Sequence, residues 1–115
     1  MIVKIVILLF FHWIGDYVLQ TNEMAANKAN GIRWLSIHVA VYAAVLLCFG
    51  LVFFRLPTAF YFVLANAGFH WVTDFFTSRM ASKYKNQPRI YFPIIGLDQF
   101  IHAATLILTL ENFSA

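Results

Sequence analysis

Residues 33–54 read RWLSIHVAVYAAVLLCFGLVFF, a run in which Arg33 is the only residue of the Lys, Arg, Asp and Glu types. At 1.5 Å per residue, an α-helix of this length is about 33 Å long, which matches the ~30 Å hydrocarbon core of a bilayer. The run therefore predicts a transmembrane helix.

Three further apolar segments flank this run, and their connections predict how the four helices are arranged. They cover residues 2–20, 58–78 and 92–110. The connection over residues 21–32 is polar and ends in the turn signal Asn30-Gly31, whereas only residues 55–57 join the second and third segments, which requires an antiparallel hairpin. We therefore predict a single all-α domain over residues 1–115, a polytopic membrane protein whose four transmembrane helices form an antiparallel bundle.

The composition supports this class and excludes others. Hydrophobic residues make up 62% of the chain and charged residues 11%, against roughly half and a quarter in a typical soluble domain. The eight Lys and Arg residues are scattered singly and the net charge is only +3, so no nucleic-acid surface is predicted. The lone cysteine, Cys48, excludes an intrachain disulfide and a cysteine-based zinc site.

Loop charges predict the orientation in the membrane. The side of the first and third connections carries six basic residues, and the other side carries two: Lys28, Arg33, Arg79, Lys83, Lys85 and Arg89 against Lys4 and Arg55. Because cytoplasmic loops carry an excess of Lys and Arg, the first side is predicted to be cytoplasmic. Both termini are then expected on the outer side.

Histidine and aspartate follow a repeated spacing inside the apolar segments. Each of the three aspartates lies four residues from a histidine, in the pairs His12 with Asp16, His70 with Asp74, and Asp98 with His102. This spacing places both members of a pair on one face of a helix. The fourth histidine, His38, lies in the second predicted helix, so each helix contributes one histidine.

The order within the pairs alternates with the direction of the helices, which places all seven side chains in the cytoplasmic half of the bundle. Each ionisable group at this depth costs roughly 2.5 kcal/mol or more, so the set indicates a function. Imidazole and carboxylate are ligands for divalent metals, with Zn favoured and Mn or Fe also suitable. The seven groups can fill one closed site or form a two-metal site that activates water.

Four more polar residues are candidates for supporting or substrate contacts. Gln20 and Asn66 each lie one helical turn from a member of the cluster, and Gln99 adjoins Asp98. Arg79 lies at the cytoplasmic mouth, where a phosphate group can bind, although a role in anchoring the helix in the membrane also fits.

The residues of these motifs also resemble those of a known family. The resemblance covers nearly the whole chain and runs through residues 12–21 (HWIGDYVLQT), Met24, Lys28, His38, residues 70–74 and residues 98–102 (DQFIH). The family consists of small bacterial and phage membrane proteins described as domain of unknown function 3307. The resemblance implies a bacterial inner-membrane protein and supports the cluster without naming a reaction; the family pattern often has a lysine where this chain has Thr77. A more distant similarity is to membrane proteins described as metal-dependent hydrolases.

Three functions follow from these observations. The leading one is a metal-dependent hydrolase acting on a phosphoester or lipid-like substrate. The second is a proton or metal-ion conduit, in which the same residues form a titrating relay. The third is an accessory or phage-encoded protein that binds a host partner and uses the metal as a structural link. A homo-oligomer is compatible with all three.

Overall fold

The computed structural model describes residues 1–114, and these residues are helical throughout apart from the connections. The elements are α1 (Ile2–Trp13), the π-helical turn η1 (Ile14–Val18), α2 (Asn22–Asn27), α3 (Arg33–Phe53), α4 (Leu56–Lys83) and α5 (Pro88–Ser114). The all-α class is therefore confirmed. Two helices, α3 and α5, are both long and apolar enough to cross a membrane.

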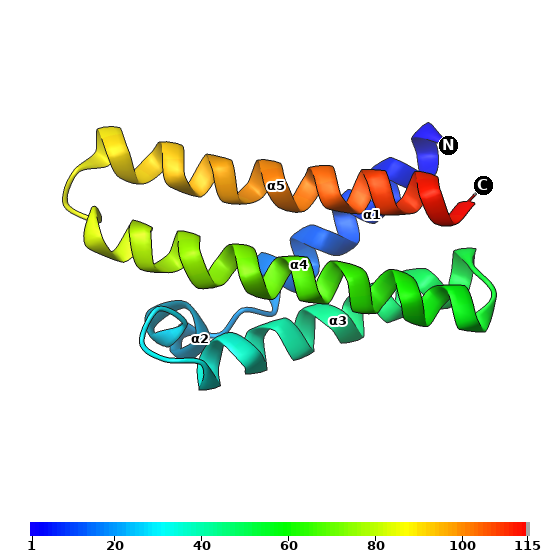
Figure 1. The fold of residues 1–115 in the computed structure, drawn as a ribbon, viewed down its shortest axis with the longest axis horizontal. Coiled ribbons are helices and arrows are strands. Elements are labelled where there is room, and N and C mark those ends of the chain that lie inside the picture. Colours follow the sequence, from blue (N-terminus) through cyan, green and yellow to red (C-terminus); the bar gives the residue numbers. More distant parts are fainter. Residues whose placement is uncertain (115) are drawn as a thin grey trace.

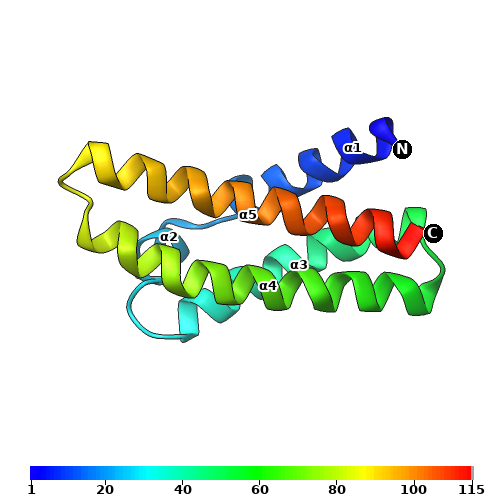
Figure 2. The same ribbon diagram turned by 45° about the horizontal axis from the view of Figure 1, so that its top comes forward.

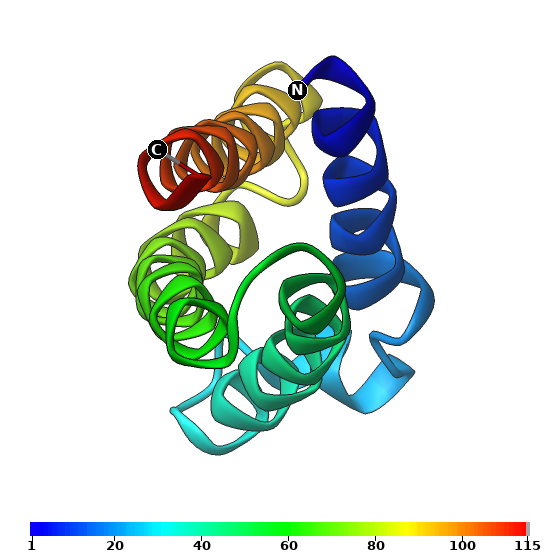
Figure 3. The same cartoon turned by 90° about the vertical axis from the view of Figure 1, so that its right-hand side faces the viewer.

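The four longer helices form a ring. Viewed along the long axis, the order around the ring is α1, α3, α4 and α5, and neighbouring helices in this order pack against one another (Figure 3). Both termini and the α3–α4 connection lie at one end, which we call the terminal end (Figure 1). Helix α2 and the α4–α5 connection lie at the other end, which we call the α2 end. Helix α1 is inclined to the other long helices (Figure 2).

Several helix limits differ from those predicted from apolarity. Helix α4 begins two residues before the predicted residue 58 and continues to Lys83, and α5 begins at Pro88 with Pro93 inside it. Pro88 lies in the first helical turn, where the missing N–H would have no partner, whereas Pro93 lies in the second turn and removes one helical hydrogen bond. The prediction used the apolar run, which corresponds to the part of a helix within the hydrocarbon core. The helices are longer than these runs, because their backbone hydrogen bonds continue into the polar residues on either side.

The segment between the first and second long helices also differs from the prediction. The first helix changes to a π-helical turn after Trp13, where the Leu19 N–H donates to the carbonyl of Ile14. The connection predicted as a polar loop contains the short helix α2, whose first turn is capped by the side chain of Thr21. Gly31 then adopts a φ of 109°, which reverses the chain into α3.

The interior has an apolar half and a polar half. The apolar half lies toward the terminal end and consists of Leu8, Tyr42, Leu46, Phe49, Phe62, Val63, Leu106 and Leu110. At the α3–α4 contact in this half, Gly50 lies against Ala59, and the missing side chain lets the two helices approach closely. The polar half lies toward the α2 end and holds the histidines and aspartates.

Replacement of Gly50 by valine is expected to destabilise the bundle by about 1–3 kcal/mol, because the new side chain must separate α3 from α4. A Cβ atom at Gly50 would lie 3.2 Å from the Cβ atom of Ala59. Gly68→Val is the matched control, since a Cβ atom there would meet nothing within 4 Å. Thermal unfolding in detergent measures both variants, and equal losses of stability would contradict a tight α3–α4 approach at Gly50.

Candidate metal centre

All seven side chains predicted as metal ligands lie in the polar half of the interior. Each is at most 7% exposed: His12, Asp16, His38, His70, Asp74, Asp98 and His102. They come from α1, η1, α3, α4 and α5, so no two neighbouring elements could form the cluster alone. The helical spacing accounts for the pairs within one helix, and the ring of helices brings the pairs together.

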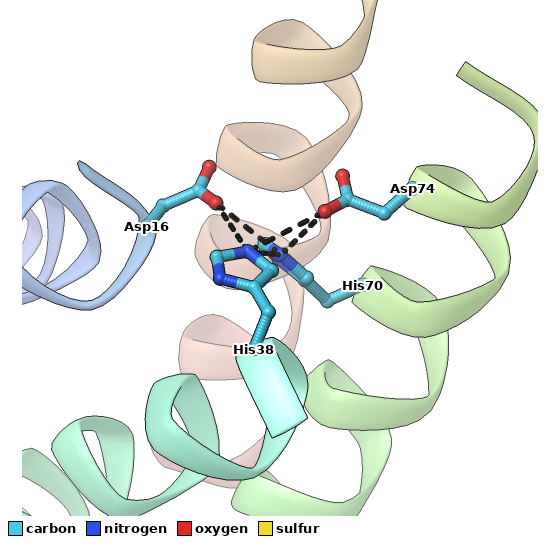
Figure 4. A group of neighbouring side chains, drawn as sticks. All are labelled: Asp16, His38, His70 and Asp74. Carbon is cyan, nitrogen blue, oxygen red and sulfur yellow. Dashed lines mark hydrogen bonds and ion pairs between the residues drawn. The ribbon is translucent and has the colours of Figure 1, made fainter. Parts of the chain in front are cut away.

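A first group consists of Asp16, His38, His70 and Asp74, whose side chains point toward one another (Figure 4). The Nε2 atom of His38 lies 2.9 Å from Asp16 Oδ1, 3.4 Å from Asp74 Oδ2 and 3.2 Å from the Nε2 atom of His70. His70 Nε2 lies 3.4 Å and 3.3 Å from the same two oxygens. Four N and O ligands placed tetrahedrally about Zn²⁺ would be separated by about 3.3 Å, so the spacing of this group fits such an ion.

The chemistry of the two imidazoles in this group also fits a cation. Their Nε2 atoms face each other at 3.2 Å, and an N–H on both nitrogens would bring two protons together. The Nδ1 atoms of His38 and His70 are buried and have no hydrogen-bond partner among the described residues. A cation between the Nε2 atoms would use both lone pairs at once.

A second group of side chains adjoins the first and consists of Asp16, Asp98 and His102. His102 Nε2 lies 3.1 Å from Asp98 Oδ2 and 3.0 Å from Asp74 Oδ1. Asp74 therefore turns one carboxylate oxygen toward each group. Asp16 does the same, because its Oδ1 atom contacts the first group and its Oδ2 atom shares the Gln99 amide with Asp98. Two carboxylates shared in this way are the arrangement that can bridge two metal ions.

His12 lies beside these groups and belongs to neither of them. The amide nitrogen of Gln99 donates to Asp16 at 2.9 Å and to Asp98 at 3.0 Å, which turns the Gln99 oxygen toward His12. The His12 Nε2–H group donates to this oxygen at 2.9 Å, and Nδ1 accepts from the Tyr42 hydroxyl at 3.1 Å. His12 and Tyr42 thus orient Gln99, which in turn holds two of the carboxylates.

Three residues of the site were not predicted from the spacing. Tyr42 lies four residues after His38, and Thr77 lies seven after His70, so the helical period could have indicated both. Thr77 donates its hydroxyl to Asp98 Oδ1. Lys28 approaches from α2, with its Nζ atom 3.4 Å from Asp74 Oδ2. The helical period gives no signal for Lys28, which directly follows α2, and apart from the loop charges only the family resemblance includes it.

The remaining predicted residues are placed as follows. Asn66 donates to the carbonyl of Phe62 and to the hydroxyl of Thr109 on α5. Arg79 donates to the carbonyls of Phe75 and Gly31, and its guanidinium lies over the ring of Phe75. The hydrogen bonds of Arg79 in the described part of the chain thus go to the backbone and not to the cluster. Gln20 lines a cavity beside Asp16.

Two adjoining cavities connect the cluster with the α2 end. One has a volume of about 270 Å³ and is bounded by α2, α4 and α5, and the other, of about 230 Å³, is bounded by η1, α2 and α5. Asp98 lines both cavities and Asp16 lines the second. The cluster is therefore accessible from the α2 end.

The three buried aspartates of the cluster need partners, because buried carboxylates are costly unless they are paired. In the part of the chain described, Lys28 is the Lys or Arg side chain that forms an ion pair with them, and their other charged partners are imidazoles such as those of His38 and His102. One or two divalent cations held by neutral imidazoles and these carboxylates would also compensate the charge.

Residues 5–115 match the family described as "Protein of unknown function (DUF3307)". The chain belongs to this family. The resemblance drawn from the sequence is therefore confirmed. Comparison with curated proteins and with solved structures gives no match.

Gln99→Leu is expected to lower the free energy of unfolding by about 2–4 kcal/mol, because two buried carboxylates each lose a hydrogen bond. The measurement is unfolding of the metal-free protein in detergent. Gln87→Leu is the control, since Gln87 is exposed in the turn before α5. A loss in Gln99→Leu no greater than that in Gln87→Leu would contradict the role of Gln99 in holding Asp16 and Asp98.

Proposed function

We propose that this member of the DUF3307 family is an integral membrane hydrolase with a two-metal centre, acting on phosphoesters. The observation that carries the proposal is the placement of Asp16 and Asp74, each of which turns one oxygen to the first group and one to the second. Carboxylates shared between two groups of ligands are typical of two-metal hydrolytic sites.

The distribution of polarity supports a membrane location. The histidines and aspartates are buried, whereas large apolar side chains are exposed on all four long helices, among them Val6, Phe10, Val52, Leu64, Phe69, Leu97, Phe100 and Leu108. Exposed apolar surface of this extent indicates contact with lipid or with another protein. The longest dimension of 44 Å equals the thickness of a bilayer with its head groups, about 40–45 Å.

The same arrangement supports a four-span topology in the inner membrane. The six basic residues assigned to the cytoplasmic side belong to α2, the α4–α5 connection and the helix ends next to them. The α2 end would then face the cytoplasm, and both termini would lie outside. The cavities that lead to the cluster would open on the cytoplasmic side.

The types of ligand indicate which metals the centre would hold. His38 and His70 would hold the first ion, Asp98 and His102 the second, and Asp16 and Asp74 both. Histidine and carboxylate ligands without cysteine suit Zn²⁺ best and also accept Mn²⁺ or Fe²⁺. When bound, two such ions would supply a hydroxide nucleophile near neutral pH and would neutralise charge on a phosphoryl group.

The chain's own side chains position the ligands and admit the substrate. Gln99 and Thr77 hold Asp16 and Asp98 by hydrogen bonds, so the carboxylates are oriented before a substrate arrives. Asp98 lies where both cavities reach the cluster. A phosphoester that enters from the α2 end would therefore meet the second group first.

The apolar half of the interior favours a closed-ended site over a conduit. A path across the bundle would have to pass the fully buried side chains of Leu8, Leu46, Leu106 and Leu110. These side chains offer no polar group for a proton or a hydrated ion. A pocket that is closed toward the terminal end suits hydrolysis better.

Detergent-purified protein loaded with Zn²⁺ and then dialysed is expected to hold two ions per chain by elemental mass spectrometry. Asp74→Asn is expected to lose both ions, because both groups use Asp74, whereas His102→Gln is expected to lose one. Glu111→Gln on α5, which removes an exposed carboxylate, is the control. The absence of metal from the wild-type protein, or two ions retained in Asp74→Asn, would refute the two-metal centre.

Hydrolysis provides a separate test. The protein in phosphatidylcholine nanodiscs is expected to hydrolyse p-nitrophenyl phosphate, to lose this activity with a chelator and to regain it with Zn²⁺ or Mn²⁺. His38→Gln is expected to reduce the rate by at least about 100-fold, since ligand removal costs at least as much as loss of a supporting hydrogen bond. Activity that resists both the chelator and this substitution would contradict the metal-dependent mechanism.

A further inference from the structure

We propose that the cleft formed by the two adjoining cavities binds a phosphate group through Lys28 and Lys85. Hydrolysis of the bound phosphoester rests on the proposed function. Binding of the phosphate group depends only on the residues that line the cleft. The cavities share Ala25, Lys28 and Asp98 among their lining residues, so they form one continuous cleft. Its inner limit is the second metal group.

The cleft lies along an open seam. Helix α2 packs against α3, and α5 packs against α4 and α1, but no Cα atom of α2 comes within 8 Å of one in α5 in the described residues. Tyr91 and Ile95 on α5 face Ala25 and Lys28 across this gap as lining residues of both cavities. A ligand can therefore reach the cleft from the side as well as from the end of the bundle.

Two positive charges line the cleft, and other basic side chains nearby are engaged elsewhere. Lys28 lines both cavities, and Lys85 lines the larger one. Arg79 instead donates to the Gly31 carbonyl, and Lys83 lies over the ring of Tyr84. The positive charge of the cleft thus comes from Lys28 and Lys85, because Arg79 and Lys83 do not line it.

Lys28 connects the cleft with the metal centre. Its Nζ atom lies 3.4 Å from Asp74 Oδ2, one of the oxygens of the first group, while the side chain remains 21% exposed. An ammonium group in this position can contact a phosphate oxygen and the cluster at the same time. It would place the phosphorus next to the second group, where Asp98 lies.

An unpartnered hydroxyl provides an independent observation. The Oγ atom of Ser78 is buried and forms no hydrogen bond within the described residues, and Ser78 lines the same cavity as Lys85. A buried hydroxyl without a partner costs free energy, and a phosphate oxygen would accept a hydrogen bond from it. The small neighbouring side chains Ala81 and Ser82 leave space for such a ligand.

The size of the cleft limits the ligand. Cavities of about 270 and 230 Å³ are near the lower limit of small-molecule sites, which is roughly 300 Å³. A lipid head group or a small soluble phosphoester fits this space. Both carry the same phosphate chemistry, and the open seam admits either one.

The test measures phosphate binding by the Zn²⁺-loaded protein in two arms. In the first, inorganic phosphate is titrated into protein in pure phosphatidylcholine nanodiscs. In the second, the nanodiscs contain 10% phosphatidic acid, and bound lipid is measured after extraction into detergent. The test variants are Lys85→Gln and the double variant Lys28→Gln/Lys85→Gln. The control, Lys83→Gln/Arg89→Gln, removes two charges at the same end that do not line the cleft.

The wild-type protein and the control are expected to bind equally, and the double variant to bind at least about tenfold more weakly in one arm or both. Loss in the phosphate arm identifies a soluble ligand, and loss in the lipid arm identifies a head group. Unchanged binding in both arms would overturn the inference. Lys85→Gln alone guards against a folding defect in the double variant, because Lys85 is exposed and forms no ion pair in the described structure.

Elemental analysis of the same samples separates the two proposals. If the protein holds metal but its phosphate affinity does not change in the lysine variants, only the phosphate site in the cleft is refuted. No metal in the wild-type protein refutes the two-metal centre, and the effect of the lysine substitutions on phosphate affinity still decides the inference about the cleft.

Discussion

The structure depends on the compensation of buried negative charge. Asp74 is 1% exposed and is contacted by His38, His70, His102 and Lys28, which come from three other helices and from α4 itself. These contacts require α2, α3, α4 and α5 to present their side chains at one depth. A shift of any helix by one turn, about 5.4 Å, would remove a partner and leave a carboxylate unpaired in an apolar environment.

The close approach of the first helix to α3 brings Asp16 to the depth of the other buried side chains. A Cβ atom at Gly15 would lie 3.1 Å from Cδ2 of Tyr42, so glycine allows η1 to lie directly against α3. The π-helical turn at this point carries Asp16 between the two groups of ligands. Tyr42 then couples the two halves of the interior, because its ring belongs to the apolar core and stacks on His70 while its hydroxyl holds His12.

The sequence predicted what a single helix determines and missed what depends on contacts between helices. The three His/Asp pairs follow from a period of 3.6 residues, and their common depth follows from the alternating direction of the helices. No such rule predicts which side chain of another helix each of these residues contacts. His12 was predicted as a ligand from its spacing alone, and its contacts with Gln99 and Tyr42 could not be predicted in this way. Lys28 was noted only as a loop charge and in the family resemblance, because α2 was predicted as a loop.

The two groups of ligands differ in their access to the cleft, and this difference assigns them different roles. His38, His70 and Asp74 of the first group line neither cavity, whereas Asp98 of the second group lines both. Closed sites with four protein ligands are typical of structural metals, and catalytic metals keep a position open to substrate. The residues of the first group would therefore suit a structural metal, and those of the second group a metal within reach of the substrate. In a two-metal centre of this kind both groups would use Asp16 and Asp74, so loss of metal from the first group would also disorder the ligands of the second.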